Sequence, residues 1–159
     1  DAIDDLTGIR TDFANLPPGT RAIALPDNSY NGGTPFLKVF GRPENESVCE
    51  CERGQTSSLA QSLHMMNAGD IRHKLNSGGG RVDLLTKSTE PVEERVAELY
   101  LQAFSRRPTP EEMKVAVDYL TAPQTDAAGN AIDPQQAQRD GFQDLLWALM
   151  NTKEFLFNH

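Results

Sequence analysis

The chain has 159 residues, of which 38% are hydrophobic, and this is enough for one domain with a buried core. Its 15 Lys and Arg residues are outnumbered by 23 Asp and Glu residues, so the formal net charge at pH 7 is -8. This charge argues against nucleic acid or an anionic membrane surface as a partner, because both attract clustered cations. No run of about twenty apolar residues is present, so the sequence predicts no membrane span.

The chain begins with DAIDDLTGIRTDF, without a starting Met and without a basic segment ahead of an apolar one. We interpret it as an excised or processed piece of a longer protein. The stretch at residues 15–36, NLPPGTRAIALPDNSYNGGTPF, is rich in Pro, Gly and Asn, which interrupt regular structure. Residues 1–55 are therefore predicted to form an irregular segment that packs on the rest of the domain.

Two short pieces of this segment carry apolar residues. RAIAL at residues 21–25 is predicted to be extended, and TPFLKVF at residues 34–40 is either a strand or a helical turn. The segment therefore holds at most one or two short strands.

From residue 56 the spacing of apolar residues becomes helical. Leu59, Leu63 and Met66 recur at intervals of four and three, after Thr and Ser residues that can cap a helix. A short helix capped by Asp70 follows, and after the glycines of NSGGG another is predicted at RVDLLTKS. Residues 56–159 are thus predicted to be the α-helical body of a single domain.

A helical hairpin is predicted over residues 90–121. Its first helix has Pro91 in the first turn and the basic residues of SRRP in the last turn, as the helix dipole favours. Thr109, Pro110 and Glu112 form the pattern of a capping box at the start of the second helix. The apolar face of that helix is expected to comprise Met113, Ala116, Val117 and Leu120.

A final long helix is predicted to begin near Asp133 and Pro134, because Asp is a good cap and Pro suits the first turn. Its apolar face comprises Phe142, Leu145, Leu146, Leu149 and Met150, with Trp147 on the flank. The predicted fold class is therefore mainly α, a bundle-like helical domain behind an irregular N-terminal third.

Both cysteines lie in one short stretch, CECERGQTSSLAQSLHMMN at residues 49–67. Cys49 and Cys51 could chelate a metal through two thiolates, with His64 supplying a nitrogen, although strong zinc patterns have the spacing C-x-x-C. The same pair could instead be a disulfide or a redox couple, strained by its small ring. A third interpretation is a structural hinge in which the cysteines are small buried side chains.

Two arginines flank the cysteines. Arg42 and Arg53 could bind a carboxylate or another anion through their guanidinium forks. The alternative is an internal salt bridge with the abundant acidic residues. The sequence contains no recognisable catalytic motif, so catalytic residues are unknown and no cofactor-binding residue is predicted.

Three segments together resemble a known family: FLKVFGRPENESVCECERGQTSSLAQSLHMMNAGDIRHKL, AELYLQAFSRRPTPEEM and DLLWALMNTKEFLFNH. They are similar to the C-terminal domain of unknown function in large planctomycete secreted proteins that also carry a cytochrome-c-like domain. The resemblance covers about residues 34–159. It implies export to the periplasm or the outside of the cell, and haem elsewhere in the parent protein rather than in this piece.

The sequence supports three hypotheses for function. The first is an accessory or interaction domain whose partners are the other domains of the same parent chain. The second is part of an enzyme active site shared with those domains, around Arg42, Arg53, the two cysteines and His64. The third is a thiol-redox or metal-binding module centred on Cys49 and Cys51. The first is preferred, because the helical body is clear and a catalytic constellation is not recognisable.

The preferred hypothesis predicts that the purified chain folds without metal and that Cys49→Ser leaves it folded. Elemental analysis with a free-thiol count, alongside far-UV circular dichroism of the variant, measures both. Stoichiometric zinc, or two thiols that oxidise reversibly at a mild potential, would contradict it.

Overall fold

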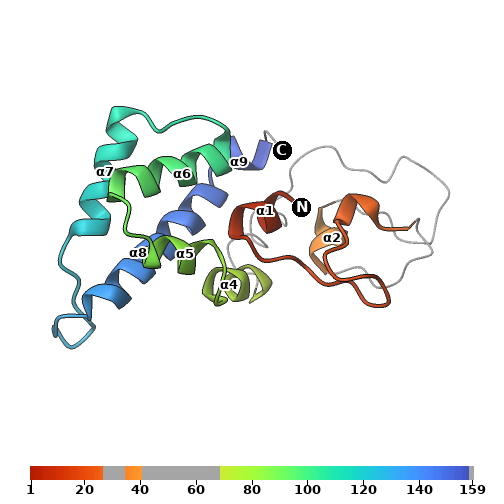
Figure 1. Ribbon diagram of the computed structural model, residues 1–159, viewed down its shortest axis with the longest axis horizontal. Coiled ribbons are helices and arrows are strands. Elements are labelled where there is room, and N and C mark those ends of the chain that lie inside the picture. The colour runs from red at the N-terminus through yellow and green to blue at the C-terminus, as the bar shows by residue number, and fades with distance from the viewer. Residues whose placement is uncertain (27–34, 41–68, 158–159) are drawn as a thin grey trace. The chain divides into compact units, whose positions relative to one another are not determined.

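The computed structural model describes residues 1–26, 35–40 and 69–157 (Figure 1). Over these residues the predicted fold class is confirmed, since the regular structure is helical and the described part contains no strand. The predicted helix after residue 56 and the boundary at residue 55 fall outside the described residues, so both stay predictions.

Close contacts divide the chain into two units. One comprises Asp1 and Arg10–Gly69, and the other, called the helical unit below, comprises Ala2–Ile9 and Asp70–His159. The helical unit contains most of the described regular structure and every residue that lines the groove discussed below.

In the first unit, residues 21–25 are not extended as predicted. Ala22–Ala24 form a 3-10 turn, η1, because the Asp1 carboxylate accepts hydrogen bonds from the backbone N–H groups of Ala22 (2.8 Å) and Ile23 (3.0 Å). In an extended strand these two N–H groups would be free to donate to a neighbouring strand, whereas here both donate to Asp1. The second apolar piece takes the helical alternative, as helix α2 (Pro35–Val39).

The helical unit begins with a helix in a segment that was predicted to be irregular. Helix α1 (Ala2–Thr7) buries Leu6 almost completely and packs on helices α5 and α6. Lys74 of α4 fixes the position of α1, because its ammonium lies 3.0 Å from the Asp4 carboxylate and donates a hydrogen bond to the carbonyl of Ile9 at 2.8 Å. With six residues, the helix is too short for its apolar residues to show a helical spacing in the sequence. A helix of this length is not stable alone, so its stability comes from these tertiary contacts.

Helices α4 (Gly69–Asn76) and α5 (Arg81–Lys87) are short, as predicted, and bury Ile71 and Leu75 of α4 and Val82 and Leu85 of α5. α4 begins at Gly69, so Asp70 lies within its first turn instead of capping it. Asp83 joins this region to helix α8, since its carboxylate accepts from Gly79 N–H (3.0 Å), Lys87 (2.9 Å) and Arg139 (3.1 Å). The hydrogen bond from Lys87 is the largest cause of the lowered pKa of Asp83.

The predicted hairpin is confirmed as helices α6 (Val92–Phe104) and α7 (Pro110–Thr121), which pack on each other (Figure 1). The capping box is present: Thr109 Oγ1 accepts from the N–H of Glu112 at 3.2 Å, and the Glu112 carboxylate accepts from the N–H of Thr109 at 2.7 Å. The basic residues do not lie in the last turn of α6, because the helix ends at Phe104 and Ser105 takes a left-handed conformation (φ 57°).

Helix α8 (Pro134–Met150) is the longest element and packs against α5, α6 and α7 (Figure 1). Its predicted start is confirmed, since the Asp133 carboxylate accepts from two backbone N–H groups of the first turn. Phe142, Leu146 and Met150 are fully buried, and short helix α9 (Lys153–Phe157) closes the described chain. α8 is therefore the central element of the core.

Phe142→Ala should lower the free energy of unfolding by about 3–5 kcal/mol, because it removes a fully buried ring and leaves a cavity among tightly packed neighbours. Leu84→Ala on α5 is the control, since Leu84 is 57% exposed, and should cost less than about 1 kcal/mol. Urea denaturation measures both. Equal losses for the two variants would mean that α8 is not the centre of the core.

Candidate functional site

The site residues predicted from sequence lie in one part of the chain. Arg42, Cys49, Cys51, Arg53 and His64 all fall within residues 41–68, outside the described residues. Their proximity, redox state and metal content therefore stay predictions. Within the described ranges, no group of three or more His, Cys, Asp or Glu side chains is arranged to hold a metal ion.

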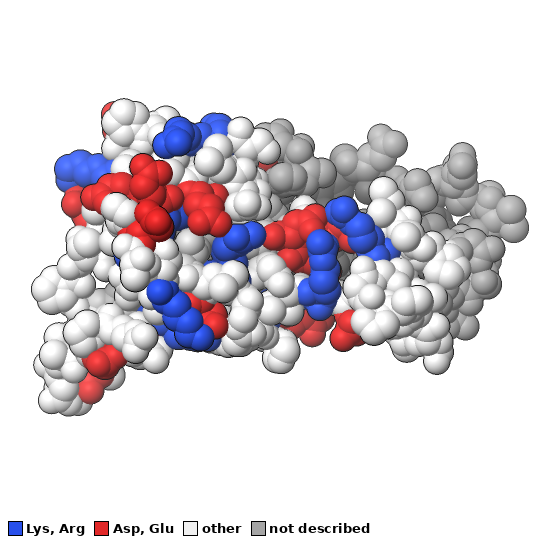
Figure 2. Space-filling view, in the orientation of Figure 1, with Lys and Arg blue, Asp and Glu red and all other residues white. Residues whose placement is uncertain are grey.

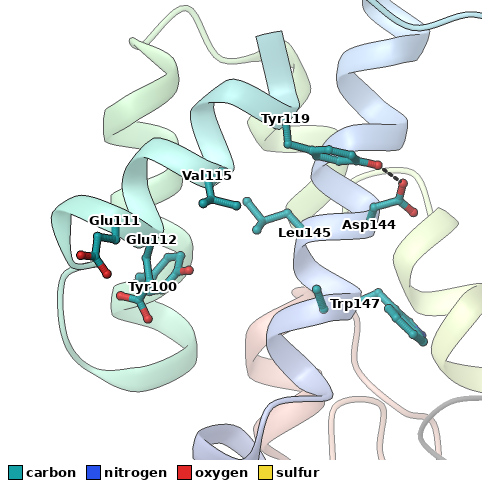
Figure 3. A pocket seen from close by; sticks show the side chains of 10 residues that line it. Tyr100, Glu111, Glu112, Val115, Tyr119, Asp144, Leu145 and Trp147 are labelled. Atoms are coloured by element: carbon teal, nitrogen blue, oxygen red, sulfur yellow. Dashed lines mark hydrogen bonds between the residues drawn. The ribbon is translucent and has the colours of Figure 1, made fainter. Parts of the chain in front are cut away.

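The described residues do form a hollow on the surface of the helical unit, between helices α6, α7 and α8. This hollow, called the groove below, has a volume of about 620 Å³ (Figure 3). Its lining combines small and large apolar side chains, aromatic rings and three carboxylates, from Tyr100, Glu111, Glu112, Val115, Ala116, Tyr119, Asp144, Leu145, Trp147 and Ala148.

Helical spacing explains why these residues meet. On α7, Glu112, Val115, Ala116 and Tyr119 are three or four residues apart and so share one face. On α8, residues 144, 145 and 148 share a face in the same way. Val115 and Leu145 face each other between the two helices, and they form the apolar middle of the groove (Figure 3).

The groove keeps apolar surface in contact with solvent. Val115 is 70% exposed and Tyr119 is 46% exposed, although both lie on a helix that buries Ala116 and Leu120. These two side chains are outside the apolar face that the sequence predicted for α7. Their spacing of four residues marks a second stripe on the same helix, and that spacing is the signal that could have revealed it.

One end of the groove is organised by a hydrogen bond across the two helices. The Tyr119 hydroxyl donates to Asp144 Oδ2 at 2.7 Å (Figure 3). This hydrogen bond is the largest cause of the raised pKa of Tyr119, because the carboxylate favours the protonated phenol. It holds the Asp144 carboxylate in a fixed orientation at the edge of the groove.

The other end of the groove adjoins an ion cluster centred on Arg106, two residues beyond the end of α6. Two of its guanidinium nitrogens donate to the Glu112 carboxylate at 2.8 Å and 2.9 Å. The guanidinium also donates a hydrogen bond to each of the two carboxylate oxygens of Glu154, on α9, both at 2.7 Å. The guanidinium carbon also lies 5.7 Å from the centre of the Tyr100 ring, so one side chain links the hairpin turn, α9 and the groove.

The charges of this cluster stabilise one another. The hydrogen bonds from Arg106 are the largest cause of the shift of the Glu112 pKa from 4.5 to about 2, and they also lower the pKa of Glu154. The same bonds raise the pKa of Arg106. Burial raises the pKa of the Tyr100 phenol, so the aromatic wall of the groove stays neutral at ordinary pH.

In the parts of the chain that the structure describes, no helix is both long enough and apolar enough to cross a bilayer. For these residues, the prediction that the chain contains no membrane-spanning helix is confirmed.

Comparison with known protein families finds a match over part of the chain. A family model described as PSD1, a protein of unknown function (DUF1553), matches residues 19–120. This stretch includes the cysteine segment, the α6–α7 hairpin up to its last residue but one, and every residue of α7 that lines the groove. No curated protein matches the chain, and no solved structure matches it.

The lowered pKa of Glu112 predicts an acid-sensitive contribution to stability. A carboxylate with a lower pKa in the folded protein stabilises the fold fully above its ordinary pKa, 4.5 here, and loses that effect as the pH falls toward its folded pKa, about 2. Above its ordinary pKa of 4.5, Glu112→Gln should therefore have a lower melting temperature than the parent chain. As the pH falls toward 2, the melting temperature of Glu112→Gln should decrease by less than that of the parent chain.

The matched control is Glu111→Gln, which removes the same charge from the exposed neighbour. Thermal unfolding followed at a series of pH values compares the three proteins. If Glu112→Gln and the parent chain had parallel pH profiles, the Arg106 cluster would not be formed in solution.

Proposed function

Since the chain belongs to the PSD1 family of proteins of unknown function (DUF1553), we propose that it acts as an interaction domain, which docks a segment of another domain in the groove between α6, α7 and α8. The proposal depends on one observation: the groove leaves apolar side chains in solvent on a rigid pair of helices. Such a hollow, rimmed by polar groups, is typical of a surface that receives a partner.

The energetics favour docking over solvent exposure. Burying exposed apolar surface gains roughly 25 cal/mol per Å², so covering Val115, Tyr119 and Leu145 would favour binding. The groove walls are already fixed, at one end by the Tyr119–Asp144 hydrogen bond and at the other by the Arg106 cluster. Little ordering entropy is therefore lost when a partner binds.

The resemblance of residues 34–159 to the C-terminal domain of planctomycete secreted proteins supports a more specific context. In this proposal the chain is part of a longer, exported protein, periplasmic or extracellular. Its partners are the other domains of that protein, including a cytochrome-c-like domain that would hold the haem. The described helical unit would then be an accessory domain and bind no cofactor itself.

Docking can be tested with the remaining domains of the full-length protein, produced separately and titrated with this chain by calorimetry. Val115→Glu places a charge in the apolar middle of the groove and should weaken binding by at least about tenfold. Leu84→Glu, at an exposed apolar position on α5 outside the groove, should bind as the parent chain does. Unchanged affinity of Val115→Glu, or no binding by the parent chain, would contradict the proposal.

A further inference from the structure

We propose that the partner segment is an amphipathic helix that brings two basic side chains to the groove, one to Glu111 and one to Asp144, with apolar side chains between them. This inference rests on the proposed docking function and adds the chemistry of the occupant. It follows from which charges around the groove are already neutralised and from how far apart the remaining ones lie.

Most of the charged groups near the groove are paired within the helical unit. Glu112 is engaged by Arg106, which also binds Glu154. On the same helix, the Lys114 ammonium lies 2.6 Å from the Asp118 carboxylate. The Lys114–Asp118 pair is neutral, and the Arg106 cluster keeps one net negative charge that Arg106 shares between two carboxylates.

Two carboxylates of the lining lack a basic partner. Across the described residues, no Lys or Arg lies within salt-bridge distance of Glu111 or Asp144. Asp144 receives the Tyr119 hydroxyl on one oxygen, which orients it without neutralising it. The groove therefore presents an apolar middle between two uncompensated negative charges, and a cationic partner complements that pattern.

The surrounding field acts in the same direction. The chain carries a net charge of -8, and acidic side chains gather around α6 on the face shown in Figure 2. A basic segment is attracted and oriented by such a field before contact, whereas an acidic segment is repelled. Charge complementarity therefore favours a basic partner over a second copy of this chain, which has the same net charge.

The spacing of the two carboxylates fits a helical partner. Asp144 lies beside Tyr119, because it accepts the hydrogen bond from the Tyr119 hydroxyl. Glu111 and Tyr119 are eight residues apart on α7, which is about 12 Å along the helix axis. On a partner helix, positions i and i+7 share a face and are about 10 Å apart, within reach for flexible Lys or Arg side chains. Apolar residues at i+3 and i+4 then lie over Val115 and Leu145, in the helix-in-groove mode of recognition.

The test uses a short Ala- and Gln-based peptide with Lys at i and i+7 and Leu at i+3 and i+4. Trp147 lines the groove and is the single Trp of the chain, so its fluorescence reports binding, with calorimetry as a second measurement. One control peptide carries Glu in place of both lysines. The other has both lysines on the opposite face, so that its composition is unchanged.

The Lys peptide should bind at least about tenfold more tightly than either control, and its affinity should fall as salt is added. Glu111→Gln and Asp144→Asn keep the shape of each side chain and should each weaken binding several-fold. Glu94→Gln removes the same charge from the first turn of α6, outside the groove, and should leave binding unchanged. Circular dichroism confirms that each variant is folded.

The outcomes separate this inference from the docking function. If the Lys and Glu peptides bind equally and Val115→Glu abolishes both, the groove docks apolar helices without charge selection, and this inference is wrong while docking stands. If Val115→Glu leaves binding of the Lys peptide intact, the peptide adheres elsewhere on the acidic surface, and both proposals fail. Absence of binding by all three peptides would also overturn the inference.

Discussion

The close approach of α8 to α7 at Gly141 is the contact on which the described surface depends. A Cβ at this position would lie 2.8 Å from Leu120 Cδ2, so glycine lets α8 pack against α7 without displacing the Leu120 side chain. Phe142, the next residue, fills the core on the other side. The same crossing brings Tyr119 to Asp144 and leaves Val115 facing Leu145 further along α7, where the groove lies.

The opposite end of α7 is held by a different kind of interaction. Glu112 completes the capping box with Thr109 and also receives the Arg106 guanidinium, which binds Glu154 on α9. These groups are about one-third exposed, and exposed ion pairs contribute little free energy individually. Their role is to orient the hairpin turn, while the buried face of α8 supplies most of the stability.

Local sequence signals predicted the elements whose causes are local. The capping box at Thr109, the Asp133 cap and the apolar period of α8 all lie within a few residues of the structures they specify. Helix α1 was missed because its stability comes from Lys74, far along the chain. The turn at Ala22 was wrongly predicted as extended for a similar reason, since Asp1 supplies its hydrogen bonds.

The groove could not be predicted from the period of α7 alone. Val115 and Tyr119 lie beside the main apolar stripe, so only the position of α8 makes them one surface with Leu145. The link from Arg106 to Glu154 spans 48 residues and has no local signal. The cysteine segment drew attention in the sequence because of its composition, and its structure lies outside the described residues.

In the proposed function, a partner docks on the surface between α7 and α8. The most direct test is to map backbone amide chemical shifts of the chain by NMR while the Lys peptide, with Lys at i and i+7 and Leu between them, is added. The largest changes are expected at the middle of the groove, at Val115, Ala116, Leu145 and Ala148, with little change in α4 and α5. Changes centred on α4 and α5, or none above the level seen with the Glu peptide, would contradict it.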